Sequence, residues 1–147
     1  KRSIFFEKNL KDHSCVHILT LPSVESVKSG KVPVELPEPS FELFYSAQEY
    51  VEHLKYLLYL TKTYKNYHLC ISQKNIDTNL HVAVKDQVGV IVFKKDQPIR
   101  LFAINHPDMT NAFYCYAEDF FNKLPEQSKD RKYVVQMLEK LIRDLKE

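Results

Sequence analysis

Glycine is scarce in this sequence, and its scarcity excludes several common kinds of site. Only Gly30 and Gly89 occur in the 147 residues. A phosphate-binding P-loop, a dinucleotide-binding fingerprint and a Gly-x-Ser-x-Gly nucleophile elbow all need closely spaced glycines, because their backbone turns sharply or approaches a ligand closely. The sequence therefore contains none of these motifs. Tryptophan is absent as well, whereas tyrosine and phenylalanine occur nine times each.

Other absences narrow the class of protein. No apolar run approaches the roughly 18–20 residues that cross a bilayer, and Glu7 and Lys8 interrupt the N-terminal run too early for a signal peptide. The net charge is +2 and the lysines are scattered, whereas nucleic-acid-binding surfaces carry a basic stripe. The three cysteines, Cys15, Cys70 and Cys115, are far apart and lie within apolar runs, so we expect buried thiols in a reducing cytoplasm. We expect no membrane contact.

Short apolar runs dominate the middle of the sequence and predict strands. Their short connections favour an antiparallel meander over residues 67–73, 80–84, 88–94 and 99–104. Residues 13–22 predict an earlier strand, residues 1–12 an edge strand or the tail of a linker, and the proline-rich residues 22–40 an extended arm. Phe41–Tyr45 predicts a further short strand. Gly89 within a strand predicts a bulge or the close approach of another group.

Three helices are predicted from their caps and apolar periodicity. A capping box at Ser46–Glu49 begins a helix that runs to about Lys65. His106 is the expected N-cap of an aromatic helix with Pro107 in its first turn, and a last helix begins near residues 128–130. The sequence thus predicts a single α+β domain over residues 1–147, with residues 1–40 as a strand and arm and residues 41–147 as the core. Its fold is expected to be an antiparallel sheet of about five strands packed against two or three helices, a PAS-like or related two-layer sandwich.

The candidate chemistry lies on one face of the predicted sheet. His68 and His81 are expected to be cross-strand neighbours near Cys70. Such a face can hold a Cys–His nucleophilic pair or a metal, or it can be a half-polar face that is solvated or lines a pocket. We favour the last alternative and predict ligand binding by His68, Cys70, His81 and Tyr116, with no catalytic residue, no metal and no cofactor.

Other clusters are expected to be unremarkable in function. His13 and His17 have a spacing that zinc ligands use on helices, but they lie in a predicted strand and lack the carboxylate of the HExxH motif. Glu118-Asp119 and Lys129–Lys132 are expected to be solvated surface. The aromatic residues exceed what one core needs, which predicts a dimer interface or a small-molecule pocket between sheet and helices.

The segments Val84–Val92 and Asn105–Phe113 carry a family resemblance. With the flanking chain from Phe41 to Phe121, they resemble the C-terminal sensor or effector domain of bacterial one-component transcriptional regulators. The resemblance implies a cytoplasmic, dimeric, non-enzymatic domain that senses a small-molecule effector and controls an attached helix-turn-helix domain. It supplies no ligand-contact residues. The sequence contains no helix-turn-helix itself, and because it begins with Lys1 we expect it to be a fragment whose DNA contacts are made by a missing N-terminal domain.

Three functions remain as hypotheses from the sequence. The first is the regulatory domain that senses a ligand and dimerises. The second is a stand-alone protein-interaction domain without a ligand, such as an antitoxin or immunity protein. The third, and weakest, is a small enzyme that uses His68, Cys70 and His81.

Overall fold

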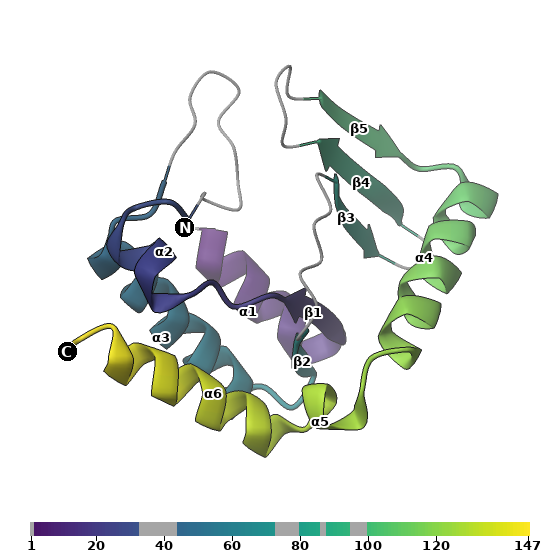
Figure 1. Ribbon diagram of the computed structural model, residues 1–147. Helices are drawn as coiled ribbons and strands as arrows, with labels where there is room; N and C mark the ends of the chain where they lie inside the picture. The colour runs from purple at the N-terminus through teal and green to yellow at the C-terminus, as the bar shows by residue number, and fades with distance from the viewer. Residues whose placement is uncertain (1, 33–43, 73–79, 86–87, 95–99) are drawn as a thin grey trace. The chain divides into compact units, whose positions relative to one another are not determined.

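The computed structural model describes residues 2–32, 44–72, 80–85, 88–94 and 100–147 (Figure 1). The chain divides into two units. Unit 1 comprises Lys1–Asn75 and Pro125–Glu147, and unit 2 comprises Ile76–Leu124. Each unit is built from different elements and is described by itself, and the single domain predicted from the sequence stays a prediction.

Unit 1 is a pair of parallel strands surrounded by helices. Its strands are β1 (Cys15–Leu19) and β2 (Tyr67–Ile71), which pair in parallel with Cys15 opposite Tyr67. The helices, in chain order, are α1 (Arg2–Asp12), α2 (Val24–Lys28), α3 (Ala47–Thr63), α5 (Glu126–Lys129) and α6 (Arg131–Asp144). Parallel strands need a long crossover connection, usually a helix, and α3 lies in the connection between β1 and β2.

The apolar stripes of α3 and α6 form the core of unit 1. Leu54 and Leu57 on α3 and Val134 and Leu138 on α6 are all almost completely buried, and the two helices run side by side in Figure 1. The predicted capping box is confirmed, since the Glu49 backbone amide donates to the Ser46 side chain and the Glu49 carboxylate accepts from the Ser46 amide. The stripe and the cap together explain why this segment is helical.

Two predictions for the N-terminal segment were wrong. Residues 1–12 were predicted as an edge strand or linker tail, but α1 is helical because Glu7 and Leu10, three residues apart, both face the body of unit 1. Residues 22–40 were predicted as an extended arm, but α2 occupies part of them, with Ser23 as its N-cap. The rest of that arm, residues 33–40, and most of the predicted strand at Phe41–Tyr45 lie outside the described residues.

The prediction of a five-stranded antiparallel sheet was also wrong. The described strands form a two-stranded parallel sheet and a separate three-stranded antiparallel sheet, so the PAS-like sandwich built on five strands does not apply to them. The burial of β2 gives the physical reason. Four of its five residues are buried, as in parallel strands covered by helices on both faces, whereas a strand of an open meander exposes every second residue.

Unit 2 contains the meander that the sequence predicted. Strands β3 (Leu80–Lys85), β4 (Gly89–Lys94) and β5 (Arg100–Ile104) pair antiparallel in that order. Helix α4 (Pro107–Asn122) follows β5, with His106 at the N-cap and Pro107 in the first turn as predicted. It packs against β3 and β4 on the sheet face that carries Val90, of which only 2% is exposed, while Val82 and Phe102 on the same face remain exposed.

Candidate functional site

The predicted ligand-binding face of β2 is mostly covered. His68 is exposed, but only 1% of Cys70 and 7% of Ser72 are exposed, and α5 packs against this strand. Burial raises the pKa of the Cys70 thiol to about 11, and the nearby positive charge of Lys129 opposes this rise only in part. A thiol with such a pKa is protonated at neutral pH, and only the thiolate is a good nucleophile or metal ligand.

The predicted pairing of His68 with His81 was wrong. His68 lies opposite Val16, because β2 pairs with β1, and His81 lies opposite Phe93, because β3 pairs with β4. His68 and Cys70 belong to unit 1, whereas His81 and Tyr116 belong to unit 2. The side chain of His81 lies outside the described part of the structure. The assignment of these four residues to ligand binding therefore stays a prediction.

Tyr116 lies on the outward side of α4. It is 63% exposed, and its neighbours Ala112 and Cys115 are exposed with it. The side of the helix that faces the sheet carries Thr110, which is buried, and Phe113, which is half-buried. Tyr116 is three residues from Phe113 and lies at the margin of this stripe, so helical spacing alone placed it too close to the sheet.

His17 and Asp119, from the two pairs that were expected to lack a functional role, each have another partner in the structure. The Nδ1 atom of His17 lies 2.8 Å from the Tyr67 hydroxyl, which satisfies both groups across the two strands of unit 1. No group of three or more His, Cys, Asp or Glu side chains able to hold a metal exists in the part of the chain that the structure describes. Asp119 is exposed and pairs with Lys123 one helical turn away, as expected of a solvated surface.

A small polar pocket in unit 1 contains one of the predicted residues. Its volume is about 100 Å³, and it is lined by Thr61, Tyr67, His68, Leu69, Lys129 and Arg131. Lys129 already forms an ion pair with Glu126, with 2.8 Å between Nζ and Oε1, and Arg131 donates to backbone carbonyl groups. Pockets for drug-sized ligands measure roughly 300–1,000 Å³, so this pocket suits water or a small ion.

Unit 2 has an apolar sheet face that α4 does not cover. Ala83, Ile91 and Ala103 lie directly opposite one another on β3, β4 and β5, and all three are exposed. Leu101 lies on the same side of β5 as Ala103 and is 66% exposed, while Ile91 is 46% exposed. We call these four residues the open face. A groove of about 570 Å³ lies on it and is lined largely by apolar residues.

The sequence contains a signal for the open face, which is the apolar run in β4. The run Val88–Phe93 is apolar on both sides of the strand, which predicted a central strand, and β4 is the central strand of its sheet. In the structure, Val90 on one face of β4 is buried, whereas Ile91 on the other face is exposed. An apolar run shows that both faces of a strand carry apolar side chains. It does not show whether other parts of the protein cover both faces.

A cluster of tyrosines around Glu7 was not predicted. The hydroxyl groups of Tyr56, Tyr59 and Tyr64 donate to the Glu7 carboxylate at 3.3, 3.4 and 3.0 Å. Burial, followed by the charge of Glu7 and its hydrogen bond, raises the pKa of Tyr56 to about 12. A hydrogen bond with Tyr59 is the main cause that raises the pKa of Tyr64. The sequence signal was the row of tyrosines in α3, which had been assigned to a broad apolar stripe.

No protein-family model, curated protein or solved structure matches the chain. The resemblance to regulator sensor domains therefore stays a prediction. Among the helices in the described part of the chain, none is both long and apolar enough to cross a membrane.

Proposed function

We propose that the chain is a non-enzymatic regulatory domain that dimerises through the open face of unit 2. One observation carries this proposal: Ile91 and Leu101 present their apolar side chains to water from the same face of a regularly paired antiparallel sheet. Large exposed apolar patches usually mark interaction sites, because leaving them in water costs free energy that an interface recovers. The proposal includes the cytoplasmic setting and the attached DNA-binding domain that the family resemblance implies.

An apolar sheet face suits binding to the same face of a second copy. In a two-fold dimer the same patch occurs on both sides of the interface, so an apolar patch meets an apolar patch. The centre of the open face contains small alanine side chains at positions 83 and 103 and the larger Ile91 and Leu101. Such alternation of small and large side chains allows two sheet faces to interdigitate.

Two further observations support a role without catalysis. Burial raises the pKa of both Cys15 and Cys70 above the ordinary thiol value, which disfavours a thiolate nucleophile at neutral pH. His17 and Tyr67 are hydrogen-bonded to each other in a small structural contact between β1 and β2. The packing of unit 1 explains these groups. It does not explain why the apolar residues of the open face are exposed.

The groove on the open face is also our proposed effector site. Its volume of about 570 Å³ lies within the range of small-molecule sites, which are lined mostly by apolar side chains. Because effector and second copy would contact the same residues, an apolar effector would shift the equilibrium from dimer to monomer. A stand-alone interaction domain, the second hypothesis from the sequence, would use the face for a different protein and would not self-associate.

Sedimentation velocity on Ile91→Lys tests the proposal. Over about 1–100 μM, we expect the wild-type chain to form a dimer with a micromolar Kd. Ile91→Lys should weaken it at least about tenfold, because the interface would bury a charge without a partner. Val16→Lys is a matched control, since Val16 is an exposed β-strand residue of unit 1 with 48% exposure against 46% for Ile91.

Two outcomes would contradict the proposal. A wild-type chain that is monomeric throughout the concentration range would remove the dimer and favour the stand-alone interaction domain. Equal dimer affinities for Ile91→Lys and wild type would show that the chain associates by another surface. Far-UV circular dichroism of each variant establishes that any lost association is not caused by unfolding.

A further inference from the structure

The contact between α1 and α3 is a built carboxylate site. Tyr56 and Tyr59 project from successive turns of α3, Tyr64 is the C-cap of that helix, and all three hydroxyls converge on the two oxygens of Glu7. The ring planes of Tyr56 and Tyr59 are stacked, and those of Tyr59 and Tyr64 meet edge to face. These ring contacts connect the three hydroxyls and reduce their freedom to turn elsewhere.

The donors in this site are neutral, which determines what it recognises. In the described part of the chain, no basic side chain forms an ion pair with Glu7. Three phenol groups can donate to an acceptor with two oxygens but supply no charge that would attract a free anion from a distance. The site therefore suits a carboxylate that neighbouring contacts deliver, such as the side chain of a docked helix.

Among the side chains of α1 that the structure describes, from Phe6 onward, few besides Glu7 contact the rest of unit 1. Leu10 is the buried residue among the described side chains of this helix, which begin at Phe6. The Phe6 ring meets the Tyr67 ring edge to face with 6.1 Å between centroids, and the Asn66 side chain donates to the Leu10 carbonyl oxygen at 3.3 Å. The docking pattern of α1 thus consists of the aromatic Phe6, then Glu7, and then Leu10 three residues after Glu7.

If α1 left the site, Leu10 would leave the core of unit 1, but the three tyrosines would stay on α3 and its C-cap. The phenol hydroxyls of Tyr56, Tyr59 and Tyr64 would then be hydrated, so that departure leaves no unsatisfied buried polar group. Isolated helices shorter than about 12–15 residues are marginal in water, and α1 has 11 residues. Released α1 would therefore gain conformational entropy, which lowers the free energy needed to replace it.

We propose that Tyr56, Tyr59, Tyr64 and Tyr67 form a docking site for a partner helix with the pattern aromatic-Glu-x-x-Leu, and that α1 occupies this site in cis until such a helix replaces it. The site lies within unit 1 and depends on different residues from the open face. Failure of either proposal therefore leaves the other one standing.

A labelled peptide of residues 2–12 tests the docking site by fluorescence anisotropy. The full chain carrying Glu7→Ala and Leu10→Ala has a weakened resident helix. It should bind the peptide at least about tenfold more tightly than wild type, because its site is free in a larger fraction of molecules. A peptide with Glu7→Ala should bind several-fold more weakly. Adding Tyr59→Phe and Tyr64→Phe to the double variant should weaken binding of the unmodified peptide by a similar factor.

Hydrogen exchange on the wild-type chain gives a second test that does not need the double variant to fold. Added peptide, at about 1 mM, should increase amide exchange in residues 2–12, because it replaces α1. The proposal is overturned if the double variant, folded by circular dichroism, binds no more tightly than wild type. It is also overturned if the peptide leaves exchange in α1 unchanged.

A tyrosinate titration shows whether Glu7 is the occupant of the site. In the wild-type chain the pKa of Tyr56 is raised to about 12, by burial first and then by Glu7. Glu7→Gln removes the charge but retains the size of the side chain, so absorbance at high pH should show the titrations of Tyr56 and Tyr64 moving toward the ordinary tyrosine pKa. An unchanged titration curve would mean that Glu7 does not occupy the cluster in solution and would overturn the proposal.

Discussion

Arg131 holds the junction between α3 and β2. Its guanidinium donates to the carbonyl oxygens of Lys65 and Tyr67 at 3.0 Å each, to that of Tyr64 at 3.3 and 3.4 Å, and to that of Thr61. The last carbonyls of a helix lack partners within it, and a cation there also interacts favourably with the helix dipole. One side chain therefore caps α3 and holds the first residue of β2.

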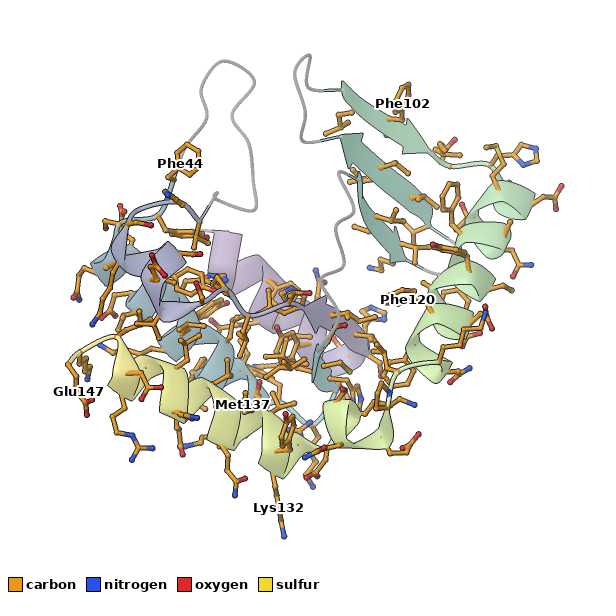
Figure 2. All side chains as sticks on the ribbon, viewed as in Figure 1. Phe44, Phe102, Phe120, Lys132, Met137 and Glu147 are labelled. Atoms are coloured by element: carbon orange, nitrogen blue, oxygen red, sulfur yellow. The ribbon has the colours of Figure 1, made fainter. Side chains whose placement is uncertain are left out.

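Arg131→Met should lower the free energy of unfolding by about 2–4 kcal/mol, because several half-buried carbonyls would lose a charged donor. Arg131→Lys should recover only part of this, since an ammonium group cannot reach as many carbonyls as a planar guanidinium. Lys132→Met is the control. Lys132 is exposed and points away from α6 into solvent in Figure 2, so its loss should change stability by less than about 0.5 kcal/mol.

Urea denaturation followed by circular dichroism measures the three variants. An effect of Arg131→Met no larger than that of Lys132→Met would show that the carbonyl contacts contribute nothing to stability. The sequence predicted plain surface for Lys129–Lys132, and for Arg131 this was wrong. The acceptors of Arg131 lie 64 or more residues away in the chain, and a charged run carries no information on which distant backbone groups need a donor.

At the scale of elements, the backbone of β5 lies close to the position that a side chain at Gly89 in β4 would occupy. A Cβ atom added there would lie 2.8 Å from the Ile104 carbonyl oxygen, closer than real Cβ contacts come. The sequence predicted a bulge or a close approach at this position, and the close approach is confirmed. Position 89 therefore requires glycine because a side chain would not fit there. Position 30 has nothing near its Cβ position, and it requires glycine because its φ is +65°.

Gly89→Ala should destabilise the meander by about 1–3 kcal/mol, because the new methyl group pushes against backbone that cannot rotate away. Amide exchange in Arg100–Ile104 should become faster. Gly30→Ala is the matched comparison, since it adds the same methyl group and costs about 1–2 kcal/mol through backbone strain but should leave exchange in β5 unchanged. Faster exchange of β5 in both variants, or in neither, would contradict the local clash.

The elements also show what sequence periodicity can predict. Each helix over residues 47–63, 107–122 and 131–144, and each strand of the meander, could be predicted because cap and apolar spacing are local properties. Strand partners could not be predicted in the same way. The pairing of β2 with β1 depends on the burial of β2, to which α5 and α6, far from it in sequence, contribute together with the neighbouring α3. The candidate site inherited this error, since His68 was placed by assuming the wrong neighbour.

At the scale of the whole molecule, the described side chains include more exposed large apolar residues in unit 2 than in unit 1. The large apolar side chains exposed there are Val82, Val88, Ile91, Leu101, Phe102, Met109 and Tyr116, and those in unit 1 are Phe6, Val16, Phe44 and Tyr59. Phe102 projects from β5 in Figure 2. Unit 2 has fewer residues than unit 1, so exposed large apolar residues make up a larger share of its described side chains. This contrast is what favours an interaction role for unit 2 and a scaffolding role for the core of unit 1.

The shifted pKa values of unit 1 make the stability of the molecule sensitive to alkaline pH. Burial raises the pKa of Cys15, and of Cys70 to about 11, and burial with Glu7 raises that of Tyr56 to about 12. Each group holds its proton more tightly in the folded chain than in the unfolded chain, so its contribution to stability is complete below the unfolded pKa. That contribution is lost as pH rises through the folded pKa. The window therefore runs from about pH 9 to pH 12.

Cys70→Ala should reduce the loss of folding stability that occurs as the pH rises through this window. A pKa shift from 9.0 to about 11 corresponds to a contribution on the order of 2 kcal/mol, and the variant no longer has a thiol to ionise on unfolding. Its stability at neutral pH should be lower, because a buried side chain is shortened, but its urea midpoint should fall less than that of wild type between pH 8 and pH 11. Cys115→Ala is the matched control, since Cys115 is exposed and its loss should leave the wild-type slope intact. If Cys70→Ala and Cys115→Ala both follow the wild-type slope, Cys70 is not buried in the folded chain and the covering of β2 by α5 is incorrect.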